Sequence, residues 1–139
     1  MHPVKGLSNC DGYKPDGISF PSSRVQAELL KKVYAQANVD PKKVCYLECH
    51  GTGTQVGDLQ ETTAVTNFFF DKKLGRDESL LVGSTKSNMG HPEPASGLSS
   101  MCKLIVTAQS GVIPKNLHYK TPNPKLEGNS FIHLNCRRI

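Results

Sequence analysis

Along the first third of the chain, the order of apolar and polar positions changes from loop to helix. Residues 1–21 are rich in Gly, Pro, Asn and Asp, which is typical of loops. Apolar residues then recur at intervals of four, at Val25, Leu29, Val33 and Ala37. This spacing places them on one face of a helix. The pattern therefore predicts a helix that Ser22 or Ser23 caps and that ends near Asn38, before Pro41.

The remaining apolar runs predict strands and helices in alternation. The Val, Tyr and Cys content of residues 43–49 and the short apolar run at residues 79–84 are typical of strands. Residues 111–119 and 131–136 also read as extended or strand segments near the end. We expect the element order α-β-α-β-α-β-β, which indicates a layered α/β unit.

Two further helices complete this pattern. One is expected from Asp58 to about residue 70, and the other from about Ala95 to Ser110. The inner face of the later helix is predicted to carry three apolar residues: Leu98, Cys102 and Ile105.

The first candidate site follows the strand at residues 43–49. Successive side chains of a strand point to opposite faces, so the core side is expected to hold Cys45, Leu47 and Cys49, and the other side Tyr46, Glu48 and His50. His50 then stands at the end of a strand, where α/β sheets tend to bind ligands. The alternative is a structural turn in which the histidine only makes hydrogen bonds within the protein.

The glycine-rich loop that follows, HGTGTQVGD, offers room and hydroxyl groups. Gly51 and Gly53 permit a tight turn, and Thr52 and Thr54 bring hydroxyls to it. A phosphate-binding P-loop is excluded because Gly57 is followed by Asp58 and not by a Lys-Ser/Thr pair.

Metal and thiol sites fit this strand poorly. A zinc site at Cys45, Cys49 and His50 fails because the strand sends the histidine away from the two cysteines. A Cys49–His50 catalytic pair fails for the same reason. We therefore predict no metal site. We expect no basic partner close enough to Cys10, Cys102 or Cys136 to activate its thiol.

The second candidate site is the stiff loop TKSNMGHPEPASG at residues 85–97. It places Lys86 five positions before His91, and it also contains Asn88. A nearby lysine favours a neutral imidazole, which can donate a hydrogen bond to a developing oxyanion. Asp58 and Glu61 could balance the lysine. The alternatives are a surface lysine and a hinge histidine.

The two loops follow strands that are neighbours in the sequence. If these strands lie in one sheet, His50 and His91 converge, and two neutral histidines donating to one oxygen make an oxyanion or enolate clamp. The chain then has an electron sink but no evident nucleophile.

Composition changes this picture only slightly. The 139 residues suffice for one domain, and the hydrophobic share of 37% allows that the chain is part of something larger. The net charge of +5 fits a solvated basic surface, an acidic protein partner or nucleic acid. Five cysteines do not suggest disulfides, and no membrane span or signal peptide is evident. We expect a cytoplasmic protein.

Four stretches resemble β-ketoacyl synthases. ECHGTGTQVGDLQE and LLVGSTKSNMGHPEPASGL look like the two histidine motifs of that family, and NCDGYKPDGISFPSS and PKNLHYKTPNP extend the similarity upstream and downstream. GHPEPASG is similar to the animal fatty acid synthase type more than to bacterial or polyketide relatives.

The resemblance implies a fold and a place in a larger enzyme. It implies the thiolase-like fold, a layered α/β/α architecture of two halves that is usually dimeric, of which residues 1–139 match the C-terminal half. The N-terminal half, which carries the nucleophilic cysteine, is then a required partner. Acyl carrier protein is the other expected partner, and its phosphopantetheine carries the substrate, so no cofactor binds the chain directly. Neither nucleic acid nor membrane is an expected partner of this family.

The resemblance also implies residue roles in a decarboxylative Claisen condensation. His50 and His91 hydrogen-bond the malonyl thioester oxygen, and Lys86 supports them. Thr52 and Thr54 contact the phosphopantetheine arm. A supporting polar network is expected at the remaining motif positions: Asp58, Glu61 and Asn88.

Two departures from the family pattern affect these expectations. Leu59 replaces the usual proline. Ser100 replaces a glutamate that pairs the lysine in many bacterial members, which favours Asp58, Glu61 or Glu93 as its partner. An inactive carrier-binding or partner-binding fragment and a polyketide synthase half are the alternatives. The isolated chain is expected to be inactive, and to self-associate or to be partly unfolded.

Overall fold

The computed structural model describes residues 5–121, 123–126, 132–133 and 137–138. The chain divides into two compact units. The first comprises the residues up to Val44 together with Gln55–Glu78, and the second comprises Cys45–Thr54 together with the residues from Ser79 onward.

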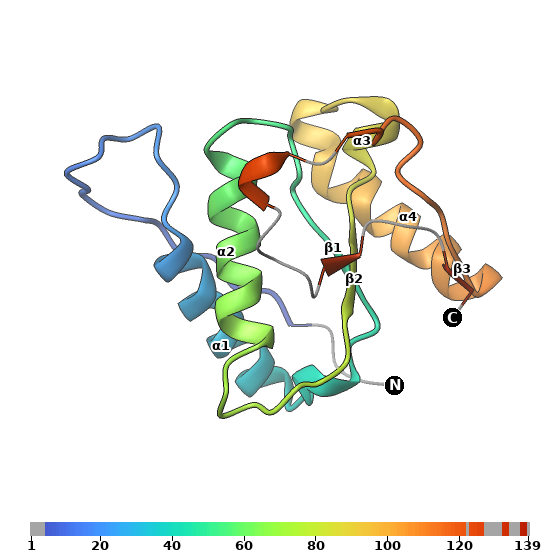
Figure 1. Ribbon diagram of the computed structural model, residues 1–139, viewed down its shortest axis with the longest axis horizontal. Coiled ribbons are helices and arrows are strands. Elements are labelled where there is room, and N and C mark those ends of the chain that lie inside the picture. The colour runs from blue at the N-terminus through green and yellow to red at the C-terminus, as the bar shows by residue number, and fades with distance from the viewer. Residues whose placement is uncertain (1–4, 122, 127–131, 134–136, 139) are drawn as a thin grey trace. The chain divides into compact units, whose positions relative to one another are not determined.

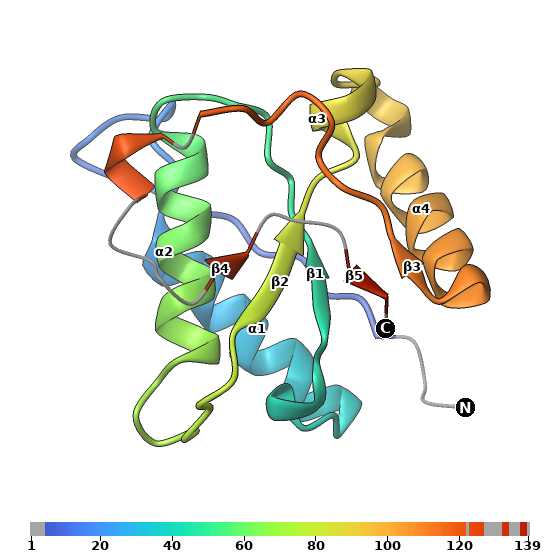
Figure 2. The ribbon, with the colours of Figure 1, turned by 45° about the vertical axis from the view of Figure 1, so that its right-hand side comes forward.

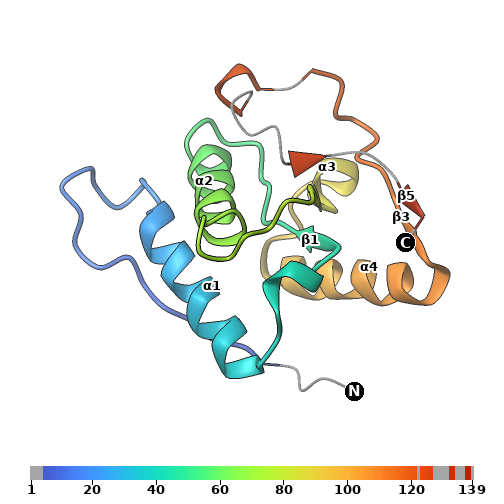
Figure 3. The same cartoon turned by 60° about the horizontal axis from the view of Figure 1, so that its bottom comes forward.

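The first unit is a pair of packed helices, α1 (Ser23–Ala37) and α2 (Gly57–Phe69), which lie side by side in Figures 1 and 3. The Ser22 hydroxyl caps α1 by accepting a hydrogen bond from the backbone N–H of Val25 at 3.3 Å. Asn38 ends the helix in the left-handed conformation, with φ of 52°. The predicted cap and end of α1 are confirmed, and α2 begins one residue earlier than expected.

Aromatic side chains form the contact between α1 and α2. The ring of Tyr34 lies 5.1 Å from that of Phe68 and 5.5 Å from that of Phe69, measured between ring centroids. Phe69 is fully buried, as Ala64 nearly is. Burial raises the pKa of the Tyr34 hydroxyl. These rings contribute large apolar surfaces to the contact between the two helices.

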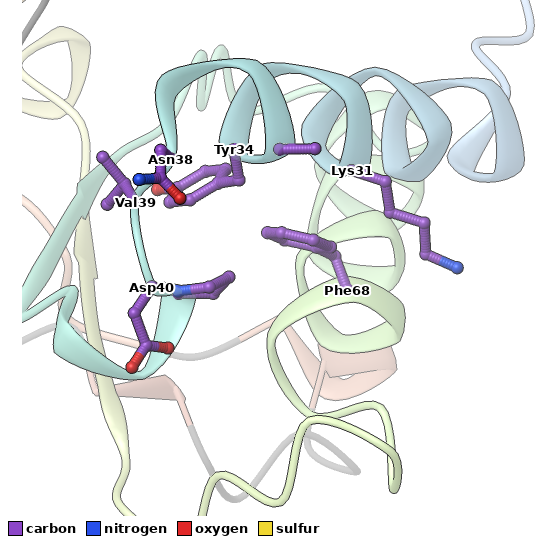
Figure 4. A pocket seen from close by; sticks show the side chains of 8 residues that line it. Lys31, Tyr34, Asn38, Val39, Asp40 and Phe68 are labelled. Atoms are coloured by element: carbon purple, nitrogen blue, oxygen red, sulfur yellow. The ribbon is translucent and has the colours of Figure 1, made fainter.

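Beyond the helix pair, Arg76 holds the 3₁₀ turn η1 (Pro41–Lys43). Its guanidinium donates hydrogen bonds to the backbone oxygens of Pro41 at 2.9 Å and Val44 at 2.8 Å. An open pocket lies beside this turn, and Figure 4 shows the rings of Tyr34 and Phe68 framing it. No sequence motif pointed to this pocket.

The second unit is built on a small parallel sheet in the order β1-β2-β4, seen in Figure 2. Its strands are β1 (Tyr46–Glu48), β2 (Leu80–Gly83) and β4 (Ile132–His133). In the register of β1 and β2, Glu48 lies opposite Gly83. The parallel pairing of the two strands that precede the histidine motifs brings their carboxyl ends to one edge, as the sequence predicted.

A second ladder and several helical turns complete this unit. The antiparallel ladder joins β3 (Val112–Ile113) to β5 (Arg137–Arg138). The helices are α3 (Lys86–Met89), η2 (Glu93–Ala95), α4 (Ser96–Ser110) and η3 (Pro124–Leu126). The strand predicted over 111–119 is therefore two residues long. Of the one predicted over 131–136, residues 132–133 form β4 and the rest, with Cys136, lies outside the described residues.

The predicted inner face of α4 is wrong. Leu98 and Ile105 are 63% and 57% exposed, and Cys102 is exposed as well. The face turned into the unit carries Lys103 and Thr107 instead. The helix is amphipathic as the spacing indicated, but its apolar stripe has no cover within the part of the chain that the structure describes.

The predicted strand faces are correct on one side only. Tyr46 and Glu48 do share a side, because the Tyr46 hydroxyl donates to a Glu48 carboxylate oxygen at 2.5 Å. On the predicted core side, Cys49 is buried and Leu47 half-buried, but Cys45 is exposed. The strand begins only at Tyr46, so the alternation does not extend back to Cys45.

Candidate active site

The loop that carries His50 is seated against the end of β2. The Ser84 hydroxyl donates a hydrogen bond to the backbone oxygen of His50 at 3.1 Å. Gly51 has φ of +50°, and a Cβ placed on it would lie 2.6 Å from the Ser84 Cβ. Only glycine combines that backbone angle with so close an approach. The turn after β1 therefore fixes the backbone from which the His50 ring projects.

His91 is oriented by the backbone that follows it. The N–H of Glu93 donates a hydrogen bond to Nδ1 of His91 at 2.9 Å. Glu93 makes this contact with φ of +45°, which is uncommon for a residue other than glycine. Because Nδ1 accepts, the neutral ring carries its proton on Nε2. His91 is thus prepared to donate a hydrogen bond from Nε2.

The two imidazoles lie together at the carboxyl edge of the sheet. The ring centroids of His50 and His91 are 5.3 Å apart, and the ring planes are nearly perpendicular, at 84°. Both residues are exposed in the described part of the chain. The predicted convergence of the two histidines is confirmed. The arrangement lets two ring N–H groups approach one oxygen atom from different directions.

Lys86 is a buried lysine and not a surface one. It occupies the first turn of α3 and is only 8% exposed. Glu93, a described residue of the same unit, forms no ion pair with Lys86. Asp58 and Glu61 belong to the other unit, so their pairing with Lys86 stays a prediction.

Asn88 fastens α3 to the segment at residues 115–117. Its side-chain amide donates to the backbone oxygen of Lys115 at 3.1 Å, and its oxygen accepts from the backbone N–H of Leu117 at 2.8 Å. Asn116 adds a second connection, since its side-chain oxygen accepts from the backbone N–H of Ser84 at 3.3 Å. Asn88 therefore stabilises the histidine loop through the backbone, and Asn116 is a supporting residue that sequence reasoning missed.

A buried ionic cluster, which sequence reasoning also missed, lies at the end of β1. Glu48 and Lys103 form an ion pair at 2.7 Å, with side chains 3% and 9% exposed, and the Lys103 ammonium also donates to the Tyr46 hydroxyl at 2.7 Å. Burial raises the pKa of Tyr46, and the hydrogen bond to the Glu48 carboxylate raises it further. Tyr46 stays a neutral donor as a result. The strand alternation that put Tyr46 and Glu48 on one side was the available signal.

The remaining predicted site residues are dispersed. Thr52 is half-buried and Thr54 exposed on the loop after β1, and the structure gives no test of their expected role toward a phosphopantetheine arm. Asp58 and Glu61 lie on α2. Throughout the described ranges, no three His, Cys, Asp or Glu side chains gather closely enough to hold a metal ion. Nor does any helix in those ranges have the length and apolarity to cross a membrane.

Comparison with known proteins decides the family. Residues 4–120 match the profile of the family described as Beta-ketoacyl synthase, C-terminal domain. The chain belongs to this family. Solved ketosynthase domains with high structural similarity show that the chain has the expected α/β, thiolase-like fold.

Two solved ketosynthases illustrate that similarity. The ketosynthase from module 1 of the bacillaene synthase of Bacillus amyloliquefaciens is 31% identical, with a TM-score of 0.83 over 94% of this chain and 25% of its own. The oxazolomycin ketosynthase domain OzmH KS7 of Streptomyces albus is 31% identical, with a TM-score of 0.81 over 90% of this chain and 21% of its own.

Curated relatives include polyketide synthases and a fatty acid synthase. A highly reducing polyketide synthase of Penicillium crustosum is 48% identical over 122 residues, which are 86% of this chain and 5% of that protein. A fatty acid synthase of Anser anser anser is 44% identical over 109 residues, which are 78% of this chain and 30% of that protein. This ketosynthase C-terminal domain thus spans only a small part of its relatives, and their similar identities do not single out the animal fatty acid synthase type.

Proposed function

We propose that this chain supplies the enolate clamp of a β-ketoacyl synthase. The observation that carries the proposal is the pair of rings of His50 and His91, 5.3 Å apart, with His91 Nδ1 already engaged by the Glu93 N–H. In a family of condensing enzymes, such a pair suits a carbonyl oxygen that becomes negatively charged. Two preorganised N–H donors stabilise that charge without reorganisation during the reaction.

The reaction is a decarboxylative Claisen condensation. The bond between the malonyl carboxylate and the α-carbon breaks, carbon dioxide leaves, and the electron pair moves onto the thioester oxygen as an enolate. His50 and His91 hydrogen-bond that oxygen. The enolate α-carbon then attacks the carbonyl of an acyl-cysteine thioester, a carbon–carbon bond forms, and the cysteine thiolate leaves. No oxidant or reductant is needed.

The partners follow from this chemistry. The acyl-cysteine belongs to the ketosynthase N-terminal half. We assign the exposed apolar side chains of α4, among them Leu98, Met101 and Ile105, to contact that half. Acyl carrier protein delivers the malonyl group on phosphopantetheine, which Thr52 and Thr54 contact. Lys86 supports the histidines, and the complete domain forms a homodimer in the cytoplasm.

A chimera tests the clamp. Residues 1–139 replace the corresponding segment of the ketosynthase of the Anser anser anser fatty acid synthase, and release of carbon dioxide from malonyl-carrier is measured. His50→Ala or His91→Ala is expected to lower kcat about 10²–10³-fold, since each removes one oxyanion donor. His118→Ala, an exposed histidine of the same unit, is the matched control. Full decarboxylation in either of the first two variants would refute the clamp.

The complete enzyme could be a fatty acid synthase or a polyketide synthase. We favour a fatty acid synthase because the motif GHPEPASG is similar to that of the animal enzymes. A polyketide synthase is the second candidate, because several of the matched relatives are highly reducing polyketide synthases. Chimeras in both contexts decide between them: the first assignment predicts faster condensation in the fatty acid synthase. Carrier binding without decarboxylation in both contexts would instead favour a binding fragment.

A further inference from the structure

The carboxylate of Glu48 joins the two segments that carry the candidate catalytic histidines. Its Oε2 atom accepts hydrogen bonds from Lys103 at 2.7 Å and from Tyr46 at 2.5 Å. Its Oε1 atom accepts from the backbone N–H of Thr85 at 2.5 Å. Glu48 is two residues before His50, and Thr85 is six residues before His91. One side chain therefore connects the end of β1 to the start of the second histidine loop.

Stability alone explains this cluster poorly. Removing two charges from water is costly, and apolar replacements of similar volume are often as stable as a buried ion pair or more so. The side chain of Glu48 is only 3% exposed, so it bears that cost in full. What apolar residues could not reproduce is the directional contact with the Thr85 N–H. The geometry, and not the burial, is the distinctive property of the cluster.

The sheet leaves room for this arrangement. Gly83 lies opposite Glu48 in the register of β1 and β2, and a Cβ on Gly83 would lie 2.6 Å from the Tyr46 hydroxyl oxygen. Lys103 reaches the cluster from the inward face of α4. Strand β1, helix α4 and a backbone N–H two residues after β2 thus meet at a single carboxylate.

We propose that Glu48 is a positioning residue, which holds the ends of β1 and β2 together through Thr85 so that the rings of His50 and His91 keep the separation needed to share one oxygen. Lys103 and Tyr46 fix the orientation of its carboxylate. Glu48 does not touch the substrate. This inference rests on the proposed function, and it assigns to the clamp a support that is distinct from Lys86.

Two matched double variants of the chimera separate positioning from stability. Glu48→Gln with Lys103→Met and Glu48→Leu with Lys103→Met both remove the buried charge pair and keep similar volumes. Only the glutamine retains an oxygen that can accept from the Thr85 N–H. We expect kcat for malonyl decarboxylation to be about tenfold to a hundredfold lower in the leucine variant than in the glutamine variant, with similar KM values, because misplacement of about 1 Å has costs of that order.

A backbone variant tests the same contact without changing the cluster. Thr85 has φ of −58°, which proline adopts readily, so Thr85→Pro deletes the N–H donor at a compatible angle. Thr85→Ala keeps that donor and is the control. We expect a lower kcat for the proline variant than for the alanine variant. If the leucine double variant does not fold, this pair alone tests whether the Thr85 N–H contact positions the histidines.

A second readout does not depend on activity. In histidine-labelled chimeras, NMR is expected to show a ring–ring proton contact between His50 and His91 that persists in the glutamine and alanine variants and weakens in the leucine and proline variants. Equal kcat and an equal ring–ring contact within each folded pair would overturn the proposal. If the unmutated chimera releases no carbon dioxide, the proposed function fails, and the NMR comparison still decides the role of Glu48.

Discussion

At the scale of single residues, strand alternation located the candidate catalytic histidine that follows β1 but not the Glu48 contacts that hold the two histidine loops together. The position of His50 at the end of β1 and the rigid surroundings of His91 were evident from the sequence, and the rings do meet. Strand alternation put Glu48 on the same side as Tyr46 but gave it no role, because its other partners are not evident from a short strand. Those partners are Lys103, which is 55 residues away, and the backbone of Thr85. Such distant contacts follow from topology, which local patterns do not contain.

Gly51 provides a residue-scale prediction. Gly51→Ala introduces both strain at φ of +50° and a Cβ only 2.6 Å from that of Ser84. Gly53→Ala introduces strain at φ of +79° with no atom within 4 Å. Strain of this kind costs on the order of 1–3 kcal/mol. In chemical denaturation of the chimera, we expect Gly51→Ala to lower the free energy of unfolding more than Gly53→Ala does, and equal losses would contradict the close approach to Ser84.

At the scale of elements, the long helices and the two central strands were predictable because each has a clear period or apolar run. The cap and end of α1 were found from Ser22 and Asn38. The four-residue helix α3 was not predicted, since one turn is too short to show periodicity. Periodicity also placed Leu98, Cys102 and Ile105 on one face of α4, but it could not show what covers that face, which is exposed and not inward as predicted.

The outward stripe of α4 gives an element-scale prediction. Replacing Leu98, Met101 and Ile105 by glutamine is expected to change the stability of the chain by less than about 0.5 kcal/mol per site, because exposed positions contribute little. The same change removes the apolar surface that we assign to the N-terminal half. Light scattering of the chain and co-purification with a separately expressed N-terminal half measure the two effects.

A control substitution is available on the same helix. Gln109, which is already polar and exposed, can be changed to lysine without altering the stripe. We expect the triple variant to lose both self-association and binding to the N-terminal half, and the Gln109→Lys variant to keep them. Retention of binding by the triple variant would show that another surface makes the contact.

At the scale of the whole molecule, the chain forms two compact units, and both histidines belong to one of them. The sheet of that unit aligns the ends of β1 and β2, which explains why residues 41 positions apart share a site. The sequence could predict this alignment because parallel strands place their carboxyl ends at one edge. Local pattern could not predict the division into two units, since it depends on which long-range contacts form.

The most direct measurement is the structure of the chimera with a bound malonyl thioester analogue that cannot lose carbon dioxide. We predict that Nε2 of His91 and one ring nitrogen of His50 both lie within about 2.7–3.2 Å of the same carbonyl oxygen, the range of N–H···O hydrogen bonds. If only one ring contacts that oxygen, or if the two rings bind different groups of the analogue, the two histidines do not form a shared clamp.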